Sequence, residues 1–345
     1  MTENTWDLSG MGDALPSEAA ALLREMGVES AEFSGLFSVR FADICETVLG
    51  VFRGNLQAPS AFFATGLGVL LLLGVFGTLG KSGAREERMR EYIGALFLII
   101  ACAPGMYAVL RVAVSAVKAC TALMVALVPI LAAVVAASGS PVLSVVWQTA
   151  VFSAAQTVSA AASGFMAPCC GLIAGTGILG ALVPQVPLAE LPKKIRKCCT
   201  WIFSSMATLF TAFLSLKGIL AGSADSLTAK GIKLAVSSFI PVIGTQLGEA
   251  YASVVGSLAA VRATAGVYAI AAVCAVALPA GVQLLLWMAS LKLLGIAAGL
   301  LGRKNAVTLL SAFDSALSVL NACLLFVTVL FVLSVGIILK VKAGV

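Results

Sequence analysis

The sequence contains no histidine and very little charge. Only 11% of its 345 residues are Asp, Glu, Lys or Arg, whereas an average soluble domain contains about 25%. Without an imidazole ring there is no basis for a serine-hydrolase triad, for histidine-ligated zinc or haem, or for a histidine proton relay. We therefore expect neither an enzyme nor a cofactor.

Apolar and small residues take the place of charge. Hydrophobic residues make up 60% of the chain, 33 residues are glycine, and the mean hydropathy is +1.06. This composition predicts an all-α, multi-span membrane protein whose helices pack closely through small residues, and it argues against nucleic-acid binding. The positions with spacings suited to such contacts, within the chain or in a homo-oligomer, are Gly66, Gly74, Gly77, Gly80, Gly171, Gly175, Gly177 and Gly180.

The nine cysteines form no C-x-x-C pair, and most of them lie in apolar runs. Cysteine behaves in such surroundings as a small hydrophobic residue, so packing is the favoured interpretation and metal binding or redox chemistry the minor one.

Charge divides the chain into two parts. Residues 1–60 carry nine acids and three arginines, whereas residues 61–345 carry 19 basic and seven acidic residues. Apolar residues recur at helical spacing in the first part, which predicts a small acidic helical head before a basic membrane domain. The start shows no signal-peptide pattern, so either the head crosses with the first span or the start is incomplete.

Long uncharged runs mark the membrane segments. There are 27 uncharged residues between Arg53 and Lys81 and 71 between Lys118 and Glu190. A bilayer crossing needs about 20 residues. The sequence thus predicts seven to nine hydrophobic segments, placed near 61–80, 92–110, 119–137, 142–163, 165–184, 198–216, 234–248, 263–291 and 315–339.

Basic residues cluster in short segments and predict the orientation. The proposed cytoplasmic anchors are Lys81, Arg85, Arg88 and Arg90 after the first span, and Lys193, Lys194, Arg196 and Lys197 after the fifth. Basic loops stay on the cytoplasmic side, so the head is expected outside the cytoplasm. The tail residues Lys340 and Lys342 are expected on the same side as the anchors.

A weak internal echo suggests two related halves, about 105–216 and 217–339. Lys118 precedes Pro129 by the same number of positions that separates Lys230 from Pro241. Some transporters consist of such repeats, each with an interrupted helix. The alternative, which we favour, is chance alignment within an Ala/Val/Leu-rich sequence.

A charged segment followed by a proline is the main candidate site. Asp225 and Glu249 flank a stretch that carries Lys230 and Lys233. This stretch is either an amphipathic helix over 217–233 at the membrane interface or part of a pore wall or partner contact. Pro241 and Gly244 predict a break or a simple kink in the apolar segment that follows.

The stretch from Phe213 to Gly266 carries a resemblance to a known family. It includes Ser-Ala-Asp-Ser-Leu-Thr-Ala-Lys-Gly-Ile-Lys, ending at Lys233, and Ser-Phe-Ile-Pro-Val-Ile-Gly, ending at Gly244. It closely resembles the signature block of the stage III sporulation protein AE family. The resemblance covers most of the chain, although only this block is specific, and family members usually begin with a signal peptide.

This resemblance implies a permease-like protein of the mother-cell membrane that faces the forespore. Together with other stage III sporulation membrane proteins and a forespore partner, it would build a channel or secretion-like complex needed for endospore formation. Asp225, Lys230, Lys233, Pro241 and Gly244 would then shape a pore wall or subunit contact. The alternative is a stand-alone secondary transporter with a central cavity that contains Lys118 or Lys230.

Overall fold

The computed structural model describes residues 17–25, 41–78, 84–183, 190–239 and 244–340, and these residues are almost entirely helical, with no strand among them. The helices are α2 (Ser17–Glu25), α4 (Phe41–Asn55), α5 (Gln57–Thr78), α6 (Ala84–Ala137), α7 (Pro141–Ala161), the π-helical turn η1 (Ala162–Met166), α8 (Ala167–Leu182), α9 (Leu191–Phe239), α10 (Gly244–Leu300) and α11 (Lys304–Lys340). The all-α membrane fold expected from composition is confirmed.

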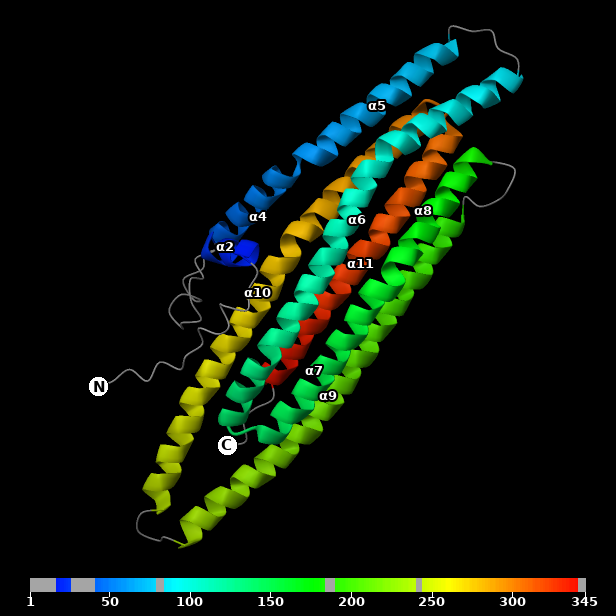
Figure 1. Ribbon diagram of the computed structural model, residues 1–345. Coiled ribbons are helices and arrows are strands. Elements are labelled where there is room, and N and C mark those ends of the chain that lie inside the picture. The colour runs from blue at the N-terminus through cyan, green and yellow to red at the C-terminus, as the bar shows by residue number, and fades with distance from the viewer. Residues whose placement is uncertain (1–16, 26–40, 79–83, 184–189, 240–243, 341–345) are drawn as a thin grey trace.

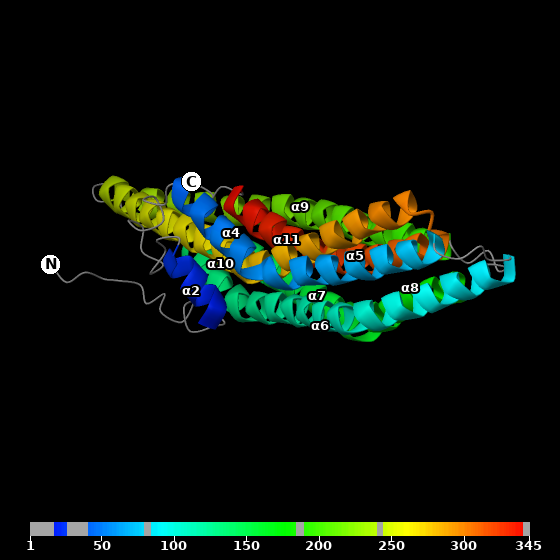
Figure 2. The same ribbon diagram turned by 90° about the horizontal axis from the view of Figure 1, so that it is seen from above.

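The long helices run antiparallel in an elongated two-layer bundle (Figures 1 and 2). α5, α10, α11 and α9 follow one another in one layer, and α6 with the α7–α8 rod forms the second. α11 is the central element because it contacts α6, α8, α9 and α10, and it buries large side chains such as Phe313, Leu317 and Phe331. α11 thus lies at the centre of the core, to which the surrounding helices also contribute.

Six segments of the described residues are long and apolar enough to cross a membrane, which agrees only roughly with the seven to nine segments predicted. α6 has 54 residues and α10 has 57, which at about 1.5 Å per residue gives each helix a length of about 80 Å. The hydrocarbon core of a bilayer is only about 30 Å thick. Counting one crossing for each 20 or so apolar residues therefore gives more crossings than these long helices make.

α6 is one helix for which the sequence predicted two separate crossings. The segments 92–110 and 119–137 were expected to be separate crossings, but both belong to this one helix. Arg111 and Lys118, which suggested a loop between them, are exposed on the helix surface. The guanidinium of Arg111 lies over the ring of Tyr107, 6.0 Å from its centroid, so its charge stays on the helix surface.

The expected crossings 142–163 and 165–184 also form one rod, composed of α7, η1 and α8 (Figure 1). Pro168 lies just after the π-helical turn and cannot donate a backbone hydrogen bond to Gly164. A widened turn at this point leaves room for the proline ring, so the rod continues without reversing direction.

Two tight reversals depend on glycine. Gly139 between α6 and α7 has a φ of 86°, and Gly302 between α10 and α11 has a φ of 71°. Both values lie in the left-handed region, which side chains with a Cβ rarely adopt. These turns allow long helices to pack antiparallel along their length.

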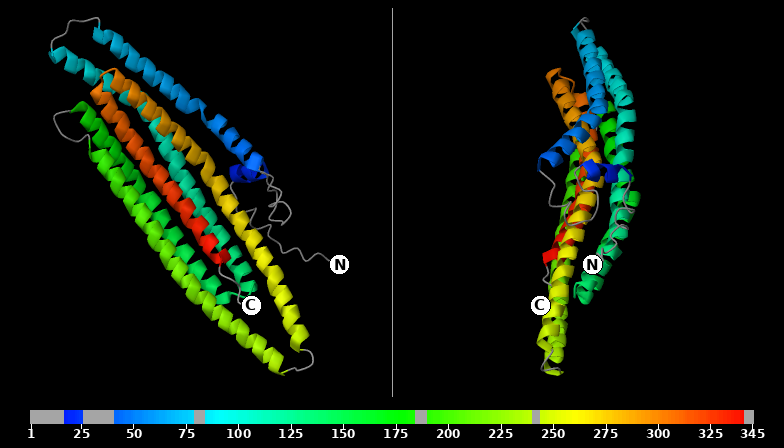
Figure 3. Two further views of the ribbon diagram at one scale, coloured as in Figure 1. Left: turned by 180° about the vertical axis from the view of Figure 1, so that it is seen from behind. Right: turned by 90° about the vertical axis from the view of Figure 1, so that its left-hand side faces the viewer.

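The head and the tail lie along the same part of the bundle. α2 and α4 pack against α10, and Leu23 of α2 is fully buried there. α11 ends at Lys340 near the α6–α7 turn, at the end of the bundle opposite to the starts of α6 and α9 (Figures 1 and 3). Lys340 thus lies at the other end of the bundle from the basic segments with which it was expected to share a side, and Lys342 lies outside the described residues.

Several glycines permit close contacts between helices, but two glycines close together in the sequence can differ in how much space surrounds them. A Cβ added at Gly177 of α8 would collide with the Cβ of Ala312 on α11. A Cβ added at Gly175 would meet no atom within 4 Å. The predicted small-residue contact is therefore made by Gly177, while Gly175 faces open space.

We predict that Gly177→Ala destabilises the protein by about 1–3 kcal/mol, because the added methyl group separates α8 from α11. Gly175→Ala serves as the matched control on the same helix, and it should be neutral or stabilising by up to about 1 kcal/mol. Thermal unfolding in detergent, followed by circular dichroism, measures both. Equal effects of the two substitutions would contradict the packing described here.

Candidate functional site

The described part of the block 213–266 belongs to the end of α9 and the start of α10, whose outer parts extend beyond the other helices as a hairpin (Figures 1 and 3). α9 ends at Phe239 and α10 begins at Gly244, and Pro241, where a break or kink was expected, lies outside the described residues. The segment 217–233, for which an interfacial helix was one interpretation, instead continues α9 without interruption. We refer to the described part of residues 226–261 as the α9–α10 hairpin.

Asp225 lies where this hairpin joins the bundle, and its side chain caps the N-terminus of α7. The backbone N–H of Val142 donates to Asp225 Oδ1 (3.0 Å), and that of Leu143 donates to Oδ2 (2.9 Å). Asp225 is only 2% exposed. The carboxylate thus satisfies two amide groups that have no partner within α7, and it is stabilised by the positive end of the helix dipole.

Residues at the start of α7 favour this cap. Pro141 occupies the first position of α7, where its missing N–H costs no hydrogen bond. Ser144 donates its hydroxyl to the carbonyl of Ala132 (2.6 Å), which ties the start of α7 to the end of α6. The turn therefore presents two adjacent amide donors to a residue that lies more than 80 positions later in the chain.

Arg262 of α10 is the second buried charge at the base of the hairpin. It is 4% exposed, and the nearby charge of Asp225 only partly offsets the cost of burying its guanidinium. Asp225 therefore joins α9 to α7 by hydrogen bonds and lies near enough to α10 to favour the charge of Arg262.

The other predicted site residues lie beyond this junction. Lys230 is exposed on α9, and no ion pair with Asp225 is formed among the described residues. Lys233 lies in α9 and Gly244 opens α10, but their side chains fall outside the described residues, as does the whole of Pro241. The structure thus groups Asp225 with α7 and Arg262 and leaves Lys230 on the hairpin surface.

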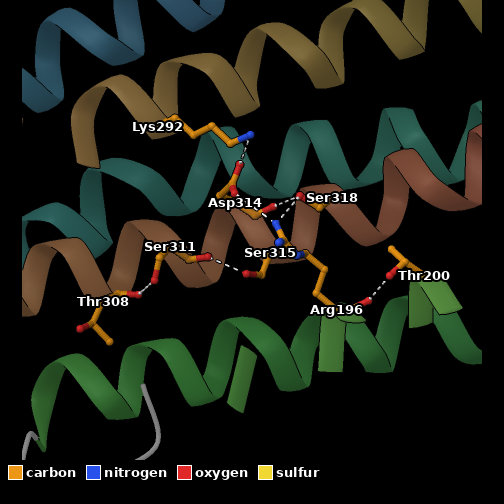
Figure 4. A network of polar contacts seen from close by, with 8 residues as sticks. All are labelled: Arg196, Thr200, Lys292, Thr308, Ser311, Asp314, Ser315 and Ser318. Carbon is orange, nitrogen blue, oxygen red and sulfur yellow. Dashed lines mark hydrogen bonds and ion pairs between the residues drawn. The ribbon is translucent and has the colours of Figure 1, made fainter. Parts of the chain in front are cut away.

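A second charged cluster was not predicted. Asp314 of α11 lies between Arg196 of α9 (3.7 Å) and Lys292 of α10 (3.9 Å), as Figure 4 shows. Arg196 also donates to the hydroxyl of Ser318 (3.4 Å). The sequence does show Asp314 as an acid within a long apolar run. Its partners lie on two other helices, however, and the spacing of residues in the sequence does not identify them.

The predicted basic anchors gather at the end of the bundle away from the hairpin. Lys193 pairs with Glu190 (3.0 Å), and Lys194 and Lys197 are exposed on the first turns of α9. The start of α6 lies at the same end of the bundle (Figure 1). It carries Arg85, Arg88 and Arg90, whereas Lys81 lies outside the described residues.

The described residues contain no group of three potential metal ligands. Six cysteines are buried, and the sulfur atoms of Cys169 and Cys199 lie 3.4 Å apart between α8 and α9. These side chains fill space between helices, as small hydrophobic residues do.

We predict that Asp225→Ala destabilises the protein by about 2 kcal/mol, because it removes the cap of α7 and leaves buried amide groups unsatisfied. The matched control is Lys230→Ala, five positions further along α9, which removes an exposed charge and should change stability by less than about 0.5 kcal/mol. Thermal unfolding in detergent compares the two. A tolerated Asp225→Ala would show that the cap does not stabilise the bundle.

The chain was compared with known proteins. Residues 27–342 match the family described as Stage III sporulation protein AE. A relative from Bacillus subtilis (strain 168), named Stage III sporulation protein AE, is 24% identical over 280 residues, which covers 79% of this chain and 70% of the relative. No solved structure matches. Because the match covers most of the chain, this protein belongs to the stage III sporulation protein AE family and has a role in sporulation.

Proposed function

We propose that the protein is a non-enzymatic, multi-span component of a channel or secretion-like complex across the two membranes between mother cell and forespore. It would lie in the mother-cell membrane with its head and hairpin outside the cytoplasm, where other stage III sporulation membrane proteins and a forespore partner could reach them. The family membership and the six apolar helices support this placement.

The observation that carries the proposal is the α9–α10 hairpin. It is built from the most specific part of the sequence, and it extends beyond the ends of α6, α7 and α11 (Figure 1). Asp225 fixes its base through the two hydrogen bonds to α7. A projecting helical hairpin with an exposed lysine offers a surface for another protein rather than a reaction chamber.

The side chains of the described residues also support a proposed role without catalysis. General acid–base chemistry near neutral pH relies most often on histidine, and the sequence has none. The buried acids of the described bundle, Asp225 and Asp314, are each engaged with helix ends or cations. Their contacts stabilise helix packing and leave no free pair of acid and base.

The stand-alone transporter is the weaker proposal. It calls for a central cavity that contains Lys118 or Lys230. A hollow of about 240 Å³ lies between α6, α8 and α11, but its lining is apolar and contains neither lysine. Both lysines are exposed on the outer surface of their helices.

We predict that the charge reversals Lys230→Glu and Lys233→Glu, made together, abolish or strongly reduce spore formation and the co-purification of other sporulation membrane proteins. The physical reason is that a reversed charge on the hairpin repels the complementary surface of its partner. The measurements are spore counts and affinity purification from sporulating cells, with membrane levels of the protein as a check on folding.

The matched control is Lys118→Glu, a reversal at an exposed lysine on α6, away from the hairpin. It should leave assembly intact. Normal assembly of the hairpin double variant would refute the proposed contact surface. Solute flux through the purified wild-type protein in liposomes would favour the transporter instead.

A further inference from the structure

The cluster at Asp314 carries more positive than negative charge. Arg196 and Lys292 both lie within 4 Å of the same carboxylate, so two cations share one anion. The carboxylate is nearly enclosed, with 13% of its side chain exposed, whereas Arg196 is 40% exposed and Lys292 is 58% exposed. The excess charge therefore faces outward from the bundle.

Donor groups of the two cations remain available. Arg196 contacts Asp314 and Ser318, and Ser318 donates its own hydroxyl to the backbone carbonyl of Asp314 (2.8 Å). A guanidinium and an ammonium carry more N–H donors than these contacts use. An oxyanion placed over the cluster could accept the remaining donors from α9 and α10 together (Figure 4).

The surface around the cluster combines basic and apolar residues. Lys193, which pairs with Glu190, shares the face of α9 that carries Arg196, since it lies three positions before it. Leu285 lies two helical turns before Lys292 on the same face of α10, toward the middle of the bundle, and is exposed. A ligand with an anionic head and an apolar tail matches both parts of this surface.

Trp201 places the cluster at the level of lipid headgroups. It lies five residues after Arg196 on α9, about 7.5 Å along the helix axis, and is 69% exposed. Trp147 and Trp287 are buried in the bundle. Exposed tryptophans in membrane helices concentrate at the boundary between hydrocarbon and headgroups.

We propose that Arg196 and Lys292 form a binding site for the phosphate group of an anionic membrane lipid, whose acyl chains lie along the exposed apolar surface of α10 at Leu285. Basic pockets between membrane helices bind anionic headgroups in this way. Asp314 holds the two cations in place from below and is not itself a ligand. The site lies at the end of the bundle remote from the hairpin and does not depend on the proposed complex.

The test measures lipid binding to the purified full-length protein by native mass spectrometry. Phosphatidylglycerol and phosphatidylcholine with identical acyl chains are compared. Wild-type protein should retain phosphatidylglycerol preferentially. The double variant Arg196→Gln/Lys292→Gln should lose roughly thirtyfold of this preference, because both cations near the phosphate are removed.

Two variants separate lipid binding from folding. Arg196→Gln/Lys292→Gln/Asp314→Asn removes all three charges, so it leaves no uncompensated carboxylate, and it too should lose the preference. Lys118→Gln/Lys217→Gln is the matched control, which removes two exposed lysines elsewhere and should keep the preference within about twofold. Asp314→Asn alone should bind phosphatidylglycerol at least as well as wild type.

Three results would overturn the proposal: equal retention of both lipids by wild-type protein, wild-type preference in the triple variant, or equal losses in the control and the double variant. Inorganic phosphate at millimolar concentration should not displace the bound lipid. Displacement would show that the cluster binds a soluble anion, which also overturns the assignment to lipid.

Discussion

The architecture depends on the need to satisfy every backbone hydrogen bond within lipid. A chain in hydrocarbon cannot use water as a partner, so interruptions of a helix are costly. α6 accordingly continues past Pro104, Arg111 and Lys118, and the π-helical turn before Pro168 preserves the α7–α8 rod. Reversals of the described chain occur where glycine can adopt a left-handed conformation or at the ends of the longest helices.

The fold class is well predicted from the sequence, because the small number of charged residues indicates that lipid surrounds most of the chain. A chain with this little charge and no histidine is a membrane protein of packed helices, as the structure confirms. Helix number is harder to predict, because hydropathy does not distinguish a loop from a charged point on a continuous helix. Arg111 and Lys118 are such points, and their stems extend along the helix surface while the charges remain accessible.

The candidate site was also predictable from the sequence only in part. Asp225 stands out in the sequence as an acid beside an apolar run, but its partners are backbone amide groups of α7, which no side-chain pattern identifies. The sequence Ser-Gly-Ser-Pro before α7 does indicate a helix start, yet it does not say which residue supplies the cap. Asp314 is linked to Arg196, 118 positions earlier, and such a pair is determined by the order of helices in the bundle.

The central position of α11 has a consequence for biogenesis. Ribosomes release α11 after the other long helices, so these enter the membrane before the helix that fills the space between them. Until α11 follows, the inner faces of α8, α9 and α10 must be covered by lipid tails or by an insertion factor. Compaction of the bundle therefore waits for α11, and a chain truncated before it would leave these faces exposed to lipid instead of forming a smaller bundle.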